Sequence, residues 1–203
     1  MEGVLIGTAA ALGLLSFYEP CTIATHTLFA ARVHAAPPGE RRRALMGLLG
    51  ARCALLALLF AGVATLGPLH LPAAAATAAL GIVGAVYLVT RTHYLPVPHL
   101  EVFRLLPAGE RAAAGVRLGL TLPACTLPLV AITAALAATT GRPILSAGAG
   151  VLFGAAFAAP TLHDVSAGLA PDRRRLLARA AAAAPWLTAG LLWGSAVWVW
   201  QAS

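Results

Sequence analysis

The sequence predicts an all-α polytopic membrane protein with six transmembrane helices in two inverted three-helix repeats. First, 60% of its 203 residues are hydrophobic and 10% are charged, and the mean hydropathy of +0.84 exceeds what a soluble domain of this size needs. Second, the basic residues gather at alternate connections between apolar segments. Third, shifting the sequence by roughly 104 residues superposes two similar cysteine segments.

The apolar segments are continuous and long enough to cross a membrane. A helix of about 20 apolar residues spans a hydrocarbon core of about 30 Å. We expect six spans at roughly 3–31, 44–66, 73–90, 113–139, 143–163 and 180–200, within one transmembrane domain, 1–203. The runs lack the alternation of a membrane barrel, so strands are not expected. Residues 1–18 carry no basic residue, so we expect the first span to be retained rather than cleaved as a signal peptide.

The arginines predict the orientation of these spans. All 14 basic residues are arginines. Thirteen surround the first, third and fifth connections: Arg32, Arg41, Arg42, Arg43, Arg52, Arg91, Arg104, Arg111, Arg117, Arg173, Arg174, Arg175 and Arg179. Arg142 alone lies on the other side. Because basic loops stay in the cytoplasm, we expect an inner-membrane protein with both termini outside. The net charge of +7 then reflects topology, and no nucleic-acid partner is expected.

The internal repeat divides the chain into halves of approximately 1–92 and 112–203. Cys21-Thr22-Ile23 aligns with Cys125-Thr126-Leu127, and the later spans of each half superpose roughly. Three crossings per half is an odd number, so the second half enters the membrane from the opposite face. In such inverted repeats, the functional site usually lies at the repeat interface, on helices broken by proline or glycine.

Both aligned cysteines lie beside prolines. Pro20 precedes Cys21, and Pro123 and Pro128 bracket Cys125, so both helices are expected to lose backbone hydrogen bonds and to bend there. An interface between the halves can bring two cysteines within the roughly 4.4–6.8 Å between Cα atoms that a disulfide needs. We therefore hypothesise a reversible intramembrane disulfide between Cys21 and Cys125.

Other polar residues within the spans have more than one interpretation. Glu19 either handles the proton that thiol exchange releases or caps the broken helix end. His26 lies about 140° around a helix from Cys21, which argues against a direct pair. Cys53 has no counterpart in the repeat, and we interpret it as a small apolar helix residue.

Near the end of the fifth span lie His163 and Asp164, which we interpret as a solvated helix end. The long connection between Arg91 and Ala112 is expected to hold either a short surface helix or a docking loop for a protein partner.

The two cysteine segments, Glu19-Pro20-Cys21-Thr22-Ile23-Ala24 and Pro123-Ala124-Cys125-Thr126-Leu127-Pro128, resemble the paired Pro-Cys and Cys-x-x-Pro helices of the CcdA family. This family is related to the transmembrane domain of DsbD, and the resemblance spans nearly the whole chain. One departure is Ala24, where the first family helix often has a second proline.

The resemblance implies a membrane thiol–disulfide carrier. Such a carrier passes reducing equivalents from cytoplasmic thioredoxin to extracytoplasmic thioredoxin-like proteins that serve cytochrome c maturation. It would make Cys21 and Cys125 the redox pair and Pro20, Pro123 and Pro128 the helix-breaking residues. Whether such an electron carrier counts as an enzyme, a thiol-disulfide oxidoreductase, is left open.

Two other classes of function remain. One is a metal or small-solute exporter with an intramembrane site of cysteine, histidine and glutamate, although ligand spacings typical of metal sites are lacking. The other is a structural subunit of a membrane complex. Neither a haem-attachment run nor a nicotinamide-binding turn is present, so no cofactor and no bound metal are expected.

Overall fold

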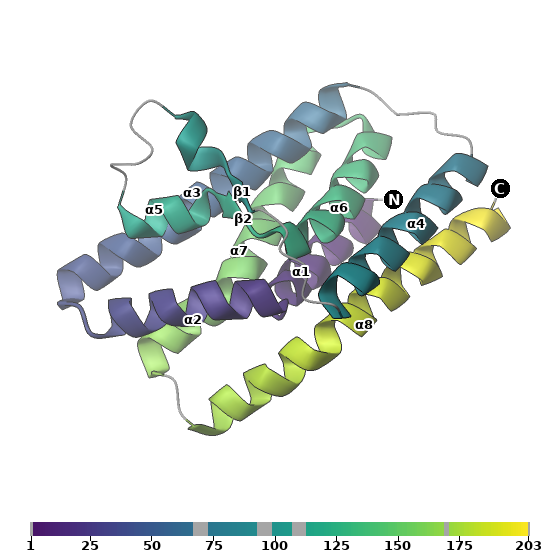
Figure 1. Ribbon diagram of the computed structural model, residues 1–203. Helices are drawn as coiled ribbons and strands as arrows, with labels where there is room; N and C mark the ends of the chain where they lie inside the picture. Colours follow the sequence, from purple (N-terminus) through teal and green to yellow (C-terminus); the bar gives the residue numbers. More distant parts are fainter. Residues whose placement is uncertain (1, 67–72, 93–98, 107–112, 169–170, 203) are drawn as a thin grey trace.

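The computed structural model describes residues 2–66, 73–92, 99–106, 113–168 and 171–202, and this part of the chain is mostly helical (Figure 1). Within it, three helical segments are long and apolar enough to cross a membrane: Pro38–Thr65, Pro143–Ala167 and Arg175–Gly194. A bent helix pair at the N-terminus qualifies as a fourth crossing. The apolar segments Thr77–Thr90 and Ala124–Thr140 are shorter. The helices indicate a membrane protein.

The first predicted span consists of two helices rather than one. Helix α1 (Glu2–Phe17) and helix α2 (Pro20–His34) meet at 72°. Glu19, between them, has the extended conformation that a residue preceding proline prefers, with φ −64° and ψ 138°. Pro20 then occupies the first turn of α2, where the missing N–H leaves no intrahelical hydrogen bond unmade.

Helices α3 (Pro38–Thr65) and α7 (Pro143–Ala167) pack closely along their lengths. Glycines allow this approach: a Cβ atom on Gly150 would lie 2.4 Å from the carbonyl oxygen of Leu56, and one on Gly154 would lie 3.0 Å from Cα of Cys53. Helix α1 packs on α7 in the same way, with Gly13 against the backbone of Phe153. Small residues at helix crossings are typical of membrane packing.

Helices α4 (Ala73–Thr92) and α8 (Pro171–Ala202) lie side by side and form a separate pair (Figure 1). The indole N–H of Trp193 donates a hydrogen bond to the carbonyl oxygen of Gly81 over 3.2 Å. Thr77 donates one to the carbonyl oxygen of Ala196 over 3.5 Å. Helix α8 also contacts α2, which joins the pair to the rest of the molecule.

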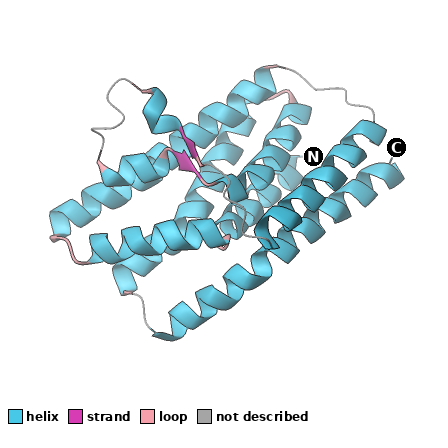
Figure 2. Ribbon diagram, in the orientation of Figure 1, coloured by secondary structure: helices cyan, strands magenta, loops and turns pink. Residues whose placement is uncertain are grey.

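The fourth predicted span is also interrupted. Helix α5 (Ala114–Gly119) is followed by strand β2 (Thr121–Leu122), the short 3-10 helix η3 (Ala124–Thr126) and helix α6 (Leu127–Thr140). Strand β2 pairs antiparallel with β1 (Leu100–Glu101), which precedes the 3-10 helix η1 (Val102–Leu105). Figure 2 shows this small sheet among the helices. Pro123 lacks an N–H, so α5 does not continue through it into η3. Pro128 lies in the first turn of α6, where a proline is tolerated.

The long connection thus contains a two-residue strand and the short 3-10 helix η1 over the described residues 99–106. Residues 93–98 and 107–112, including Arg111, lie outside the described part. The docking function that the sequence suggested for this connection stays a prediction.

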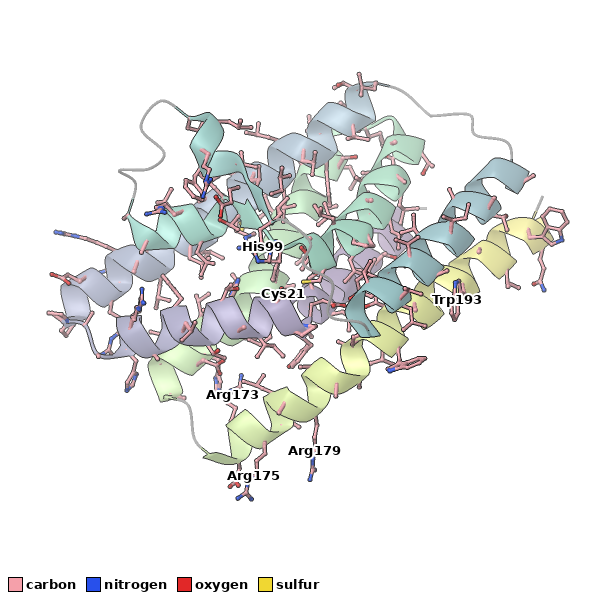
Figure 3. The ribbon with its side chains drawn as sticks, viewed as in Figure 1. Cys21, His99, Arg173, Arg175, Arg179 and Trp193 are labelled. Atoms are coloured by element: carbon pink, nitrogen blue, oxygen red, sulfur yellow. The ribbon has the colours of Figure 1, made fainter. Side chains whose placement is uncertain are left out.

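Most arginines near the first and fifth connections gather at one end of the molecule. Nδ1 of His34, at the end of α2, lies 2.7 Å from the carbonyl oxygen of Val165, near the end of α7. Arg173, Arg175 and Arg179 lie beyond that end of α7, along the first turns of α8 (Figure 3). Helices α2 and α7 therefore end together, beside the arginine-rich start of α8.

The sequence interpretation was wrong for two charged residues. Arg52 does not belong with the connection arginines: it lies midway along α3 with none of its surface exposed. Asp164 is buried rather than solvated, because it forms an ion pair with Arg173, whereas its neighbour His163 is exposed. In both cases a partner on another element compensates the buried charge: Arg173 of α8 for Asp164, and backbone carbonyl groups near α5 for Arg52.

Candidate functional site

The two helix interruptions meet where the aligned cysteines lie. Cys21 is the second residue of α2, and Cys125 is the middle residue of η3. The hydroxyl oxygen of Thr22 is 4.0 Å from Sγ of Cys125, so the two segments are in direct contact. Cys125 has no exposed surface, whereas Cys21 is partly exposed and lies where the helices cross (Figure 3).

Each cysteine follows a proline that begins a new stretch of helix. Pro20 starts α2, and Pro123 directly precedes η3 with φ −59° and ψ 138°. Pro128 lies on the other side of Cys125, in the first turn of α6. The backbone near both thiols therefore departs from regular helix, and in a membrane-spanning segment such backbone is tolerated where it is buried in protein. Whether the three prolines act as hinges stays a prediction.

Glu19 joins the cysteine region to the pair formed by α4 and α8. Its carboxylate has no exposed surface and accepts hydrogen bonds from the hydroxyl groups of Tyr87 on α4 and Thr188 on α8, the latter over 2.7 Å. Although Glu19 occupies the N-cap position of α2, its side chain makes no capping hydrogen bond. Of the two sequence interpretations, capping is therefore wrong.

His99 is a component of this region that the sequence analysis missed. Its Nδ1 atom accepts a hydrogen bond from the backbone N–H of Ala124, the residue before Cys125, over 3.4 Å. The side chain is exposed. No motif or periodicity indicates it, because a single histidine in a long connection has no fixed place until β1 pairs with β2.

Arg52 is a second component that the sequence analysis missed. Its guanidinium donates hydrogen bonds to the carbonyl oxygens of Gly119 (3.0 Å), Leu118 (2.5 Å) and Thr121 (3.2 Å). Its Cζ atom lies 4.2 Å from the centre of the Phe157 ring, a cation–π contact. The signal was present in the sequence, because an arginine in the middle of the span predicted at 44–66 costs about 2.5–3.5 kcal/mol in lipid.

His26 belongs to a neighbouring cluster. Its Nδ1 atom lies 2.6 Å from the hydroxyl of Thr161, and its ring stacks on Phe157 at 5.5 Å between centroids. Phe157 therefore contacts both His26 and Arg52. Among the described residues, Nε2 of His26 and one terminal nitrogen of Arg52 have no hydrogen-bond partner.

Cys53 lies apart from the other two cysteines in the crossing of α3 and α7. Its Sγ atom is 3.5 Å from the carbonyl oxygen of Val151. Within the described ranges, no three histidine, cysteine, aspartate or glutamate side chains are placed to hold a metal ion.

The site thus has two cysteines, a carboxylate bonded by two hydroxyls, a histidine bonded to the residue before the second cysteine, and a buried arginine bonded to the segment that leads into it. Thiols held beside water-accessible and polar groups are suited to thiol–disulfide exchange. Comparison of the chain with protein-family models, characterised proteins and solved structures found no match.

Proposed function

We propose that this protein is a membrane thiol–disulfide carrier of the CcdA type, which passes reducing equivalents from cytoplasmic thioredoxin to extracytoplasmic thioredoxin-like proteins. The observation that carries the proposal is the contact between the two cysteine segments, with the Thr22 hydroxyl 4.0 Å from Sγ of Cys125. Residues about a hundred positions apart in the sequence meet at the two interrupted helices. This arrangement supports a reversible disulfide between Cys21 and Cys125.

The proposed reaction is a two-electron exchange. A thioredoxin thiolate attacks one sulfur of the Cys21–Cys125 disulfide, forms a mixed disulfide and releases the other cysteine as a thiolate that takes up a proton. The second thioredoxin thiol then displaces the carrier cysteine. Thioredoxin leaves oxidised, and the carrier becomes a dithiol with two protons and two electrons. An extracytoplasmic disulfide reoxidises the dithiol by the same two steps in reverse.

Helix pairing supports the proposed inverted repeat. Helix α3 packs on α7 and α4 packs on α8, so the second and third spans of one half each contact their counterpart in the other half. The interrupted helices also contact each other: α1 packs on α6, and α2 packs on η3, its counterpart in the other half. A two-fold relation between the halves explains this pattern, and rocking one half against the other would expose the thiols to each side in turn.

Two residues near the thiols have proposed roles in proton transfer. Glu19 precedes Pro20 and Cys21 and is bonded to hydroxyl groups from two other helices. We propose that it accepts and returns the proton of the Cys21 thiol. His99, which accepts a hydrogen bond from the backbone N–H before Cys125, is exposed, and we propose that it exchanges the proton of the Cys125 thiol with water. The protein is proposed to lie in the inner membrane with both termini on the extracytoplasmic side, because connections rich in arginine stay in the cytoplasm.

The test is thiol alkylation with a mass tag on purified protein, before and after reduced thioredoxin. The variants are Cys21→Ser and Cys125→Ser, with Cys53→Ser as the matched control. We expect tagging of Cys21 and Cys125 only after reduction, and a mixed disulfide with thioredoxin trapped by one single variant. Cys53→Ser should react like the wild type. Free tagging of both thiols under oxidising conditions, with no response to thioredoxin, would contradict the carrier and favour the exporter.

A further inference from the structure

We infer that Arg52 is a positioning residue for Cys125: within the membrane, it fixes the backbone segment that precedes this cysteine. The inference rests on the proposed function only in taking Cys125 as the redox thiol. Arg52 comes from α3, which carries neither cysteine of the proposed pair, so its role is indirect.

The hydrogen bonds of Arg52 converge on one short segment. All three acceptors are carbonyl oxygens of Leu118, Gly119 and Thr121, where α5 ends and β2 begins. Carbonyl groups at the end of a helix lack intrahelical partners, and an arginine fork reaches several of them at once. The guanidinium therefore fixes the end of α5 in one place.

Close backbone contact strengthens this attachment. A Cβ atom on Gly119 would lie 2.8 Å from the carbonyl oxygen of Leu48 and from Cβ of Ala51. Gly115, one turn earlier, approaches the backbone of Ala44 in the same way. Helix α5 thus lies directly against α3, with Arg52 at the far end of the contact.

From the held segment to the thiol the chain is short and stiff. Three residues lie between Thr121 and Cys125, and one of them is Pro123, whose φ is fixed by its ring. On the other side, His99 and β1 bond to the same stretch. The buried position of Cys125 therefore depends on Arg52 on one side of this segment and on His99 and β1 on the other.

A purely structural role does not explain why an arginine occupies this position. The side chain has no exposed surface, and one of its terminal nitrogens has no hydrogen-bond partner within the described residues. An apolar residue of similar volume often stabilises a buried position as well as an ion does. Lysine offers a point charge on a flexible stem, and it lacks the planar fork that reaches three carbonyls.

The test compares the alkylation rates of Cys125 and Cys21 in the reduced protein, in a Cys53→Ser background and without thioredoxin. In Arg52→Met we expect the Cys125 rate to rise about tenfold relative to Cys21, because the released segment opens locally and exposes the thiol. Arg52→Lys should restore part of the difference. The matched control is Arg41→Met, which removes another arginine-to-carbonyl bond, from Arg41 to His34 over 2.7 Å, at the end of α2. It should leave the ratio unchanged.

A second variant keeps the test decisive if Arg52→Met does not fold. Gly119→Ala pushes α5 away from α3 and leaves the guanidinium intact, and it should shift the ratio in the same direction. The equilibrium constant for disulfide formation against glutathione should fall about tenfold in both variants, because the thiols are held together less tightly. An unchanged or lowered ratio in Arg52→Met and Gly119→Ala would overturn the inference. Since thioredoxin takes no part, this result is separate from failure of the proposed carrier.

Discussion

Glu19 is the residue at which four helices meet beside Cys21. It lies between α1 and α2, and its two hydroxyl donors come from α4 and α8. A buried hydroxyl or carboxylate that loses its partner costs about 1–3 kcal/mol, more than the bond itself contributes. The bonds of Glu19 are therefore among the most sensitive contacts between the helix pair and the rest of the molecule.

Replacing Tyr87 by phenylalanine tests these bonds. Tyr87→Phe removes one hydroxyl and leaves the ring, so we expect the unfolding free energy to fall by about 1–3 kcal/mol. Thermal unfolding in detergent, followed by tryptophan fluorescence, measures the change. Tyr18→Phe is the control, because Tyr18 packs on Phe17 and its hydroxyl has no hydrogen bond within the described residues. Equal midpoints for the two variants would show that the Glu19 bond contributes nothing.

Thr22 offers a test at the thiol itself. Thr22→Val has the same shape and removes the hydroxyl that lies 4.0 Å from Sγ of Cys125. A donor beside a thiolate stabilises the charged form, so alkylation of Cys125 should slow by a few fold. Thr22→Ser keeps the hydroxyl and should react at nearly the wild-type rate. Similar slowing in both variants would point to packing rather than to the hydroxyl.

Sequence reasoning reached only part of the site at this scale. The repeat selected Cys21 and Cys125, and membrane depth selected Glu19. Tyr87, Thr188 and His99 carry no signal of their own, since each becomes relevant only when another helix or strand packs beside it. Arg52 did carry a signal, but it was grouped with the arginines that set orientation.

At the scale of elements, α3 is held on two sides by glycine-containing faces. Gly115 and Gly119 of α5 approach it on one side, and Gly150 and Gly154 of α7 on the other. Close backbone approach increases van der Waals contact where lipid provides no hydrophobic driving force between helices. The position of α3, and so of Arg52, depends on these small residues.

Gly150→Ala tests the crossing of α3 and α7. Its new Cβ atom would lie 2.4 Å from the carbonyl oxygen of Leu56, so the helices must separate, and we expect a loss of about 1–3 kcal/mol. Gly148→Ala, on the same helix, meets nothing within 4 Å. It should be neutral or stabilising by up to about 1 kcal/mol, because alanine favours helix. Thermal midpoints of both variants, measured side by side, decide the matter, and a neutral Gly150→Ala would contradict the packing argument.

The helical class followed from composition, but the shape of two helices did not. Hydropathy marked 3–31 and 113–139 as continuous spans, because it counts apolar residues and ignores backbone direction. The 72° bend before α2, and the strand and 3-10 helix before α6, arise from the placement of prolines and from packing against residues distant in sequence. A local average of hydropathy takes neither into account. Helix lengths in the described residues support three or four crossings by themselves.

At the scale of the whole molecule, the arginine distribution predicts which end faces the cytoplasm. Arg179 lies near the arginine-rich start of α8, and Arg142 lies in the turn between α6 and α7. We expect Arg142→Cys, in a background without other cysteines, to react with a membrane-impermeant maleimide added to intact cells. Arg179→Cys should react only after the cells are opened. The reverse pattern would place both termini in the cytoplasm.

The buried guanidinium of Arg52 also has a consequence for how the chain is made. A nascent α3 enters the bilayer with an arginine at its centre, a residue that lowers the efficiency of insertion. Its carbonyl partners lie 66 to 69 positions later in the sequence, so they leave the ribosome after α3 and α4 have been synthesised. We therefore expect Arg52 to gain its carbonyl partners only after synthesis of the second half of the chain has begun.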